Sequence, residues 1–299
     1  MPHPRHARPT RLLALALAVT VAAAGCSLIG PSGPTHTPIP PPAFGPDDLL
    51  PDLQMTKLRE LFTARPPDSD RLELRFTAEF VNTGAGTFEV VGERPGGMGA
   101  PTMSTLQVVY NKDGSATRFP TSAVMGYQAD DHTHWHIWDF ERYEIVDLAT
   151  NETVTKSLKE GFCLWDTNKF DLTLPGAPEA AQYLDCAEKS DLSVVMGVSV
   201  GWGDVYDWSM STQFIDITGT KPGKYRLLAT TDPSGWMAES NEDNNTTWVD
   251  MEFSEGDEGV LNVTVTDYGP FAPVPEGAAT PVPGATTMPM PGSSATPVP

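Results

Sequence analysis

Three histidines that alternate along one short tract are the residues of this chain best suited to chemistry. The tract reads Asp130-Asp-His-Thr-His-Trp-His136, so His132, His134 and His136 occupy every second position. In an extended chain, alternate side chains point to one face and lie about 6.6 Å apart. A modest bend would let the three imidazoles converge on one ion. Imidazole suits copper and zinc, and three such ligands leave a position open for water, oxygen or substrate.

The spacing alone does not separate copper from zinc. The alternative interpretation of the tract is a solvated polar face of a strand. The chain's other histidines lie far from it, at His3, His6 and His36. Three nearby carboxylates could orient the imidazole rings by accepting hydrogen bonds from them: Asp130, Asp131 and Asp139.

Short alternating segments, rich in β-branched and aromatic residues, surround the tract. Residues 71–81 alternate before the turn signal Asn82-Thr-Gly-Ala-Gly86, and residues 106–110 and 116–119 flank a second turn signal as a hairpin. Further candidate strands cover residues 87–91, 136–148, 193–200, 213–217, 224–230, 246–253 and 260–265. Few long helical patterns occur, so the sequence predicts an all-β fold, an antiparallel β-sandwich with long loops.

The first residues are typical of an export signal. Three arginines precede an apolar run at residues 12–21, and Ala23-Ala24-Gly25 precedes Cys26, as in a bacterial lipobox. The run is shorter than the roughly 20 residues of a membrane span. We expect residues 1–25 to be removed and Cys26 to be lipidated, which would anchor the protein to the membrane outside the cytoplasm. Ordinary secretion is the alternative.

The composition also divides the chain into folded and unfolded parts. Residues 26–45 and 271–299 are dense in proline and small polar residues, which predicts a disordered tether and a disordered tail around a domain at residues 46–270. With 19 Lys and Arg against 39 Asp and Glu, the net charge is −20. This excludes a basic nucleic-acid-binding surface and favours cationic partners. Cys163 and Cys186 would form a disulfide in an exported domain, with two free buried thiols as the alternative.

From about residue 50 to 268 the sequence resembles the lysyl oxidases, which are copper-dependent amine oxidases with a lysine tyrosylquinone cofactor. The histidine tract followed by Asp139-Phe-Glu-Arg-Tyr-Glu-Ile145 is similar to the copper-binding segment of that family. The stretch Lys159-Glu-Gly-Phe-Cys-Leu-Trp-Asp166 resembles the segment whose lysine enters the cofactor. Asp204-Val-Tyr206, with residues 213–218 and 221–225, resembles the stretch whose tyrosine is the other precursor.

The resemblance implies a complete set of roles. His132, His134 and His136 would bind copper, Lys159 and Tyr206 would form the cofactor, and Asp204 would be the catalytic base. The substrates would be oxygen and a lysyl or other primary amine, which would leave as an aldehyde with ammonia and hydrogen peroxide. Two other functions stay open: a non-catalytic copper-binding surface module on the same fold, and a zinc-dependent hydrolase that uses the same histidines.

A second, calcium-binding site is also implied by the resemblance. Leu50-Pro-Asp-Leu53 and Glu239-Ser-Asn-Glu-Asp-Asn-Asn245 are similar to two family segments that can supply oxygen ligands to calcium. The expected ligands are Asp52, the carbonyl of Leu53, Glu239, Asn241, Asn244 and Asn245. Asn241 stands where an aspartate is more typical, which removes one charge. A solvated acidic turn is the alternative.

Overall fold

The computed structural model describes residues 39–67, 69–128, 133–159 and 161–273. The expected signal, Cys26 and His132 lie outside these residues, as do most of the expected tether and tail. The regular structure of the described residues consists of antiparallel strands joined by turns and long loops, with two 3-10 turns at Gly97–Gly99 and Asp257–Gly259. No helix in this part of the chain is long and apolar enough to cross a membrane.

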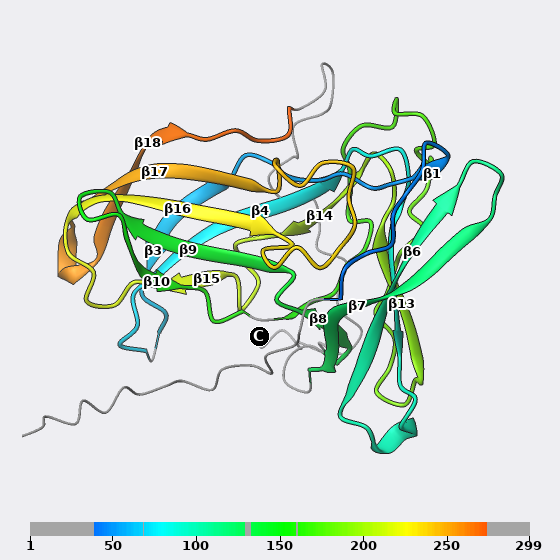
Figure 1. Cartoon of the computed structure of the whole chain (residues 1–299). Helices are drawn as coiled ribbons and strands as arrows, with labels where there is room; N and C mark the ends of the chain where they lie inside the picture. Colours follow the sequence, from blue (N-terminus) through cyan, green and yellow to red (C-terminus); the bar gives the residue numbers. More distant parts are fainter. Residues whose placement is uncertain (1–38, 68, 129–132, 160, 274–299) are drawn as a thin grey trace, which may run out of the picture. The chain divides into compact units, whose positions relative to one another are not determined.

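The strands form three antiparallel sheets (Figure 1). The seven-stranded sheet contains β1 (Asp48–Leu49), β5 (Phe88–Glu93), β6 (Thr102–Asn111), β7 (Ala116–Tyr127), β8 (Trp135–Trp138), β11 (Gly161–Phe162) and β13 (Ser193–Val198). The five-stranded sheet contains β9 (Glu141–Asp147), β10 (Glu152–Lys156), β16 (Gly223–Thr231), β17 (Thr246–Glu255) and β18 (Leu261–Tyr268). The six-stranded sheet contains β2 (Leu53–Met55), β3 (Arg59–Ala64), β4 (Glu73–Asn82), β12 (Asn168–Lys169), β14 (Trp202–Tyr206) and β15 (Phe214–Asp216).

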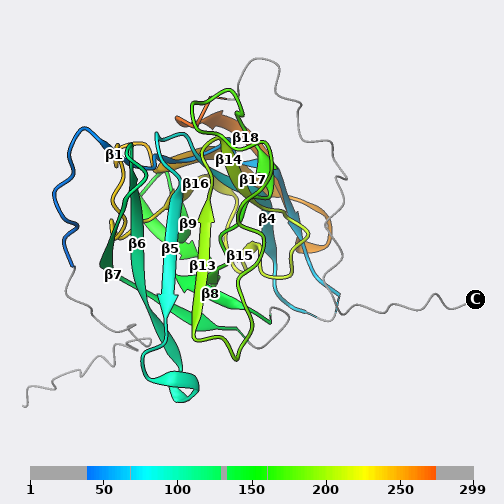
Figure 2. The same ribbon diagram turned by 90° about the vertical axis from the view of Figure 1, so that its right-hand side faces the viewer.

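The predicted all-β, antiparallel fold class is confirmed. The five-stranded and six-stranded sheets contact each other through β18 with β3, β16 and β17 with β2, and β10 with β15. The long hairpin of β6 and β7 stands with β5 and β13 at one end of this pair (Figures 1 and 2). The core therefore draws on all three sheets.

Aromatic side chains connect the sheets through the core. Phe140 lies between Phe80 of the six-stranded sheet and Phe88 of the seven-stranded sheet, with ring centroids 5.3 and 5.4 Å apart. Phe76 and Tyr143 join the six-stranded and five-stranded sheets, with centroids 5.0 Å apart. All five side chains are almost completely buried, and burial of such large aromatic groups is a main source of stability.

One predicted strand is wrong in its extent. Residues 136–148 were expected to form one strand, but β8 ends at Trp138 and β9 begins at Glu141. The chain turns at Asp139, which has a φ of 54°, and so leaves the seven-stranded sheet for the five-stranded sheet. This break separates the histidines, which precede it, from the buried face of β9, which follows it.

Candidate functional site

The two described histidines of the tract point toward one another. His136 lies on β8 and His134 lies just before it, and their Nε2 atoms are 2.8 Å apart. At this distance, one imidazole donates an N–H hydrogen bond to the other, or a cation lies between the two nitrogens. Which imidazole donates depends on the tautomers. A pair of converging ring nitrogens fits the chemistry of a copper or zinc ligand set. Asp139 is engaged elsewhere, since its carboxylate accepts from Arg142 and Ser234.

Lys159 and Tyr206 lie together, although 46 positions separate them in the sequence. The Nζ atom of Lys159 is 3.8 Å from the centroid of the Tyr206 ring and 4.7 Å from that of Phe162. Tyr206 ends β14 and is 5% exposed, and its ring meets that of Phe162 edge to face, 5.2 Å away. The amine and the phenol expected from the sequence are therefore in contact distance before any bond joins them.

Asp204 lies beside the phenol and is completely buried. The Tyr206 hydroxyl is 2.8 Å from Asp204 Oδ2 and 2.8 Å from the carbonyl oxygen of Cys163. A phenol carries one proton, so both contacts are satisfied if a protonated Asp204 donates to the phenol oxygen, which donates to Cys163. Burial raises the pKa of Asp204 well above its ordinary value, against the hydrogen bond from Tyr206, which favours the charged form. Burial likewise raises the pKa of Tyr206.

Glu141 is a second buried carboxylate here, and the sequence analysis missed it. It is 2% exposed, and one carboxylate oxygen accepts from the Tyr143 hydroxyl. Burial raises the pKa of Glu141 to about 7, against that hydrogen bond and the charge of Lys159. The alternation of residues along β9 could have indicated it. Glu141, Tyr143 and Ile145 lie on the buried face of the strand, while Arg142 and Glu144 are more exposed.

Lys159 titrates under the influence of both carboxylates. The residue keeps part of its surface exposed, but burial of its ammonium lowers the pKa to about 8. The negative charges of Glu141 and Asp204 oppose this decrease. An amine with a pKa near neutral spends a substantial fraction of its time as the free base, which is the nucleophilic form.

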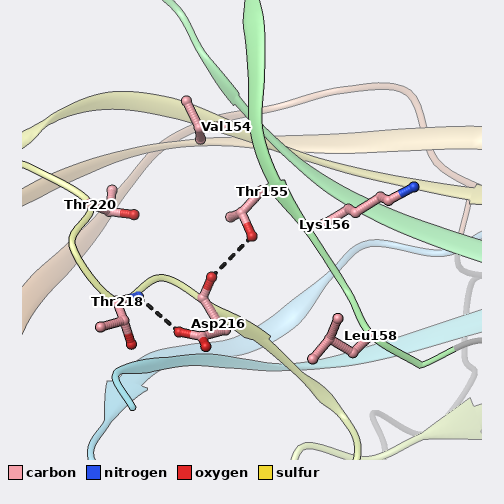
Figure 3. A pocket seen from close by; sticks show the side chains of 7 residues that line it. All are labelled: Val154, Thr155, Lys156, Leu158, Asp216, Thr218 and Thr220. Carbon is pink, nitrogen blue, oxygen red and sulfur yellow. Dashed lines mark hydrogen bonds between the residues drawn. The ribbon is translucent and has the colours of Figure 1, made fainter. Parts of the chain in front are cut away.

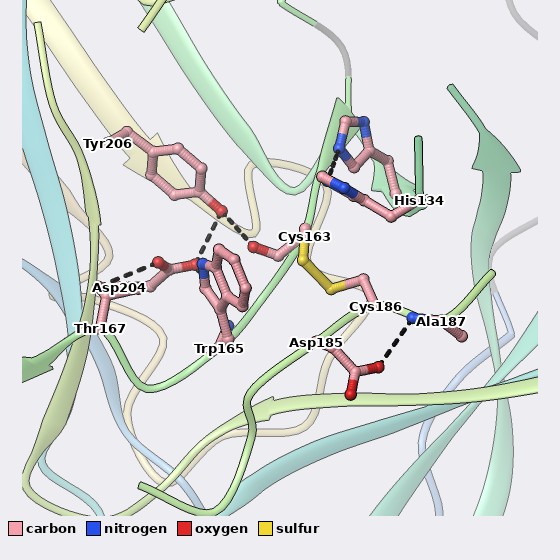
Figure 4. The surroundings of a disulfide bond; sticks show 10 residues. His134, Cys163, Trp165, Thr167, Asp185, Cys186, Ala187, Asp204 and Tyr206 are labelled. Carbon is pink, nitrogen blue, oxygen red and sulfur yellow. Dashed lines mark hydrogen bonds between the residues drawn. A yellow bond between two sulfur atoms is a disulfide. The ribbon is translucent and has the colours of Figure 1, made fainter. Parts of the chain in front are cut away.

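The short stretch after Lys159 connects the phenol to the histidines. A Cβ atom added at Gly161 on β11 would lie 2.8 Å from His136, and the carbonyl of Cys163 contacts the Tyr206 hydroxyl. Cys163 forms the expected disulfide with Cys186, whose carbonyl accepts from the amide of Trp135 on β8. In Figure 4, His134 lies on one side of Cys163, and Tyr206 and Asp204 lie on the other.

A surface hollow of the structure is lined by none of these residues. Its volume is about 320 Å³, and residues of β10 and of the 216–220 turn line it, together with Leu158 (Figure 3). Within it, the Thr155 hydroxyl donates to the Asp216 carbonyl, and the Asp216 carboxylate accepts from the Thr218 amide. These groups bind one another and offer no redox chemistry. The reactive groups are instead the buried ones around Lys159.

Most of the residues expected to bind calcium lie together at another position. The Glu239 carboxylate accepts from the amide of Leu53 and from Asn245, and Asn244 donates to Asp52. Carboxylate oxygens of Asp232, Glu239 and Glu242 lie within 4.8 Å of one another, and the first and last of these residues were not among the expected ligands. Asn241 is exposed, and its side chain accepts from the amide of Asp243 instead. Burial raises the pKa of Glu239 well above its ordinary value, against the hydrogen bonds from Leu53 and Asn245, and the charges of Glu242 and Asp232 raise it further.

Comparisons with known proteins agree with these features. A model of the lysyl oxidase family matches residues 106–263, more than half of the chain. The pig protein named protein-lysine 6-oxidase is 28% identical over 138 residues, which cover 46% of this chain and 51% of that protein. Its human counterpart is 29% identical over 138 residues, 46% of this chain and 30% of that protein. Human lysyl oxidase homolog 3 is 34% identical over 116 residues, 38% of this chain and 14% of that protein. The matched stretch thus spans at most about half of these relatives.

Proposed function

The chain belongs to the lysyl oxidase family, and we propose that it is a copper-dependent amine oxidase whose cofactor forms from its own Lys159 and Tyr206. The observation that carries the proposal is the 3.8 Å distance between the Lys159 ammonium nitrogen and the centre of the Tyr206 ring. A half-buried lysine whose ammonium lies over the ring of a buried tyrosine, with two buried carboxylates nearby, has no evident use as a structural element alone.

The proposed metal ligands are His132, His134 and His136, of which the two described residues have converging nitrogens. Bound copper would supply one-electron chemistry with oxygen, and a lysine tyrosylquinone would accept two electrons from an amine. The chain's own residues position groups and transfer protons. Cys163 fixes the Tyr206 hydroxyl through its carbonyl, and Asp204 holds a proton at the phenol oxygen or takes one from a bound substrate.

The proposed substrates are oxygen and a lysyl or other primary amine, and the products are an aldehyde, ammonia and hydrogen peroxide. The net charge of −20 supports a cationic substrate, because an acidic surface raises the local concentration of cations. We further propose export and anchoring through lipidated Cys26. In a Cys26→Ser variant, the protein should then leave the membrane fraction.

The decisive experiment is peptide mapping by mass spectrometry after copper loading in air. A cross-linked peptide pair containing Lys159 and Tyr206 is expected, with amine-dependent release of peroxide. Both should disappear in Lys159→Ala and in Tyr206→Phe, whereas Lys156→Ala, an exposed neighbour, should keep both. Copper binding without cross-link or peroxide would identify a metal-binding module instead. Selective binding of zinc with hydrolysis of an ester substrate would favour the hydrolase.

A further inference from the structure

The Lys159 ammonium lies against two aromatic rings, and the charges of two buried carboxylates act on it; we call this group of residues the cage. Tyr206 and Phe162 approach it at 3.8 and 4.7 Å, and these two rings meet each other at 88°. Cations bind favourably over aromatic faces, and more so where water is excluded. The negative charges of Glu141 and Asp204 act on the same ammonium. The arrangement has the form of a binding site for a primary ammonium ion, filled by the chain's own lysine.

Within this cage Glu141 has unused binding capacity. Its Oε2 atom accepts from Tyr143, but its buried Oε1 atom has no hydrogen-bond partner. Among the described residues, no ion pair of 4.0 Å or less joins Glu141 to Lys159. Buried polar atoms are rarely left unpaired, so an open Glu141 oxygen in this cage indicates a place for another donor.

Asp204 does not have the same capacity. Its Oδ2 atom contacts the Tyr206 hydroxyl and the amide of Trp165, and its Oδ1 atom accepts from Thr167. A group that bound a substrate there would have to displace existing partners. Glu141 is therefore the carboxylate that is free to receive one.

The charge of the cage changes when the cofactor forms. An amine nitrogen bonded to a quinone ring shares its lone pair with the ring; it keeps one hydrogen but is uncharged at neutral pH. Cross-linking thus removes the charge of Lys159 from beside Glu141, the carboxylate whose second oxygen has no partner. An unpaired buried charge is unfavourable, so the mature cage gains affinity for a new cation.

We propose that Glu141 binds the ammonium group of the incoming primary amine, in the cage that the Lys159 ammonium fills before cross-linking, and takes one proton from it. The inference rests on the proposed function for the amine oxidation that follows this proton transfer. The binding of an ammonium ion in the cage does not depend on that function. The step is a balanced proton transfer: an alkylammonium and a carboxylate become a free amine and a carboxylic acid. The free amine is the form that can react as a nucleophile.

The test uses protein without copper, in which no cofactor forms. In Lys159→Ala the cage lacks its own cation, so n-butylammonium should bind, as measured by calorimetry or by ligand NMR, whereas wild type should not bind it. Adding Glu141→Gln should weaken this binding about tenfold or more, the usual effect of losing a hydrogen bond to a charged group. Adding Glu144→Gln, the same change on the more exposed face of β9, should leave it unchanged, and n-butanol should show no dependence on Glu141.

A second measurement covers the case in which Lys159→Ala does not fold. Wild type with a verified cross-link should bind tert-butylammonium, which has no hydrogen on its amine carbon and resists oxidation, and Glu141→Gln should bind it about tenfold less tightly or worse. Equal affinity in the Glu141 variants, or no ammonium binding to folded Lys159→Ala, would overturn the inference. Absence of any cross-link in wild type would instead remove the proposed function, while ammonium binding to Lys159→Ala would still establish the cage.

Discussion

Removal of the Cys163–Cys186 disulfide should weaken the fold and the candidate site together. The carbonyl of Cys163 contacts the Tyr206 hydroxyl, and the carbonyl of Cys186 accepts from the amide of Trp135, next to two of the histidines. The bridge thus links the phenol to the histidine strand, since the carbonyl of one cysteine accepts from the Tyr206 hydroxyl and that of the other accepts from a backbone amide of β8. The perturbation is the double variant Cys163→Ser/Cys186→Ser, which removes the covalent bond with little change in side-chain volume.

The expected loss of stability follows from the sequence separation of 23 between the two cysteines. On the chain-entropy estimate, closing a loop of this length restricts the unfolded chain by about 3 kcal/mol. Equilibrium unfolding in urea should therefore show a decrease of about 3 kcal/mol in the free energy of unfolding, and wild type in excess reductant should match the variant. A chelator competition should also show weaker copper binding in the folded variant, because Trp135 lies between His134 and His136. If stability falls by this amount while copper affinity is unchanged, the reasoning about the site is refuted.

Three other changes test the remaining geometry. Gly161→Ala places a Cβ atom 2.8 Å from His136, so copper affinity in chelator competition should fall about tenfold or more, while Gly99→Ala, with open space around it, should leave copper affinity unchanged. Because the pKa of Lys159 is lowered to about 8, the fraction of its amine in the reactive free-base form grows about tenfold between pH 7 and pH 9. The rate of cross-linking, followed by mass spectrometry, should rise by the same factor. A rate that does not change with pH would contradict the assignment of Lys159. Calcium at about 1 mM should raise the thermal midpoint and EDTA should reverse the effect; equal calcium shifts in wild type and Glu239→Gln would exclude that residue as a ligand.

The sequence predicted the strand pattern well where alternation is local. Strands β16 and β17 lie within two residues of their predicted bounds. The division into three sheets was not predictable, because it depends on where the chain changes sheet. The chain changes sheet at Asp139, whose backbone is left-handed. Glycine is the usual sign of such a conformation in a sequence, and no glycine stands at this position.

The residues of the candidate site were also predictable only in part. A resemblance indicated Lys159, Tyr206 and Asp204, and the structure brings these three together. Glu141 escaped notice because it stands before Arg142 and resembles one half of a surface charge pair. Only the register of β9 against the core places its carboxyl inside, and a register is decided by distant strands.

The length of the stretch 159–163 determines which partner each of its residues meets. Four of its five positions carry an amine (Lys159), a glycine packed against an imidazole (Gly161), an aromatic ring (Phe162) and the carbonyl that accepts from a phenol (Cys163). Inserting or deleting one residue would swing alternate side chains to opposite faces and interchange these partners. Divergent lineages should therefore keep its length unchanged, and tolerate gaps in the loop between β12 and β13.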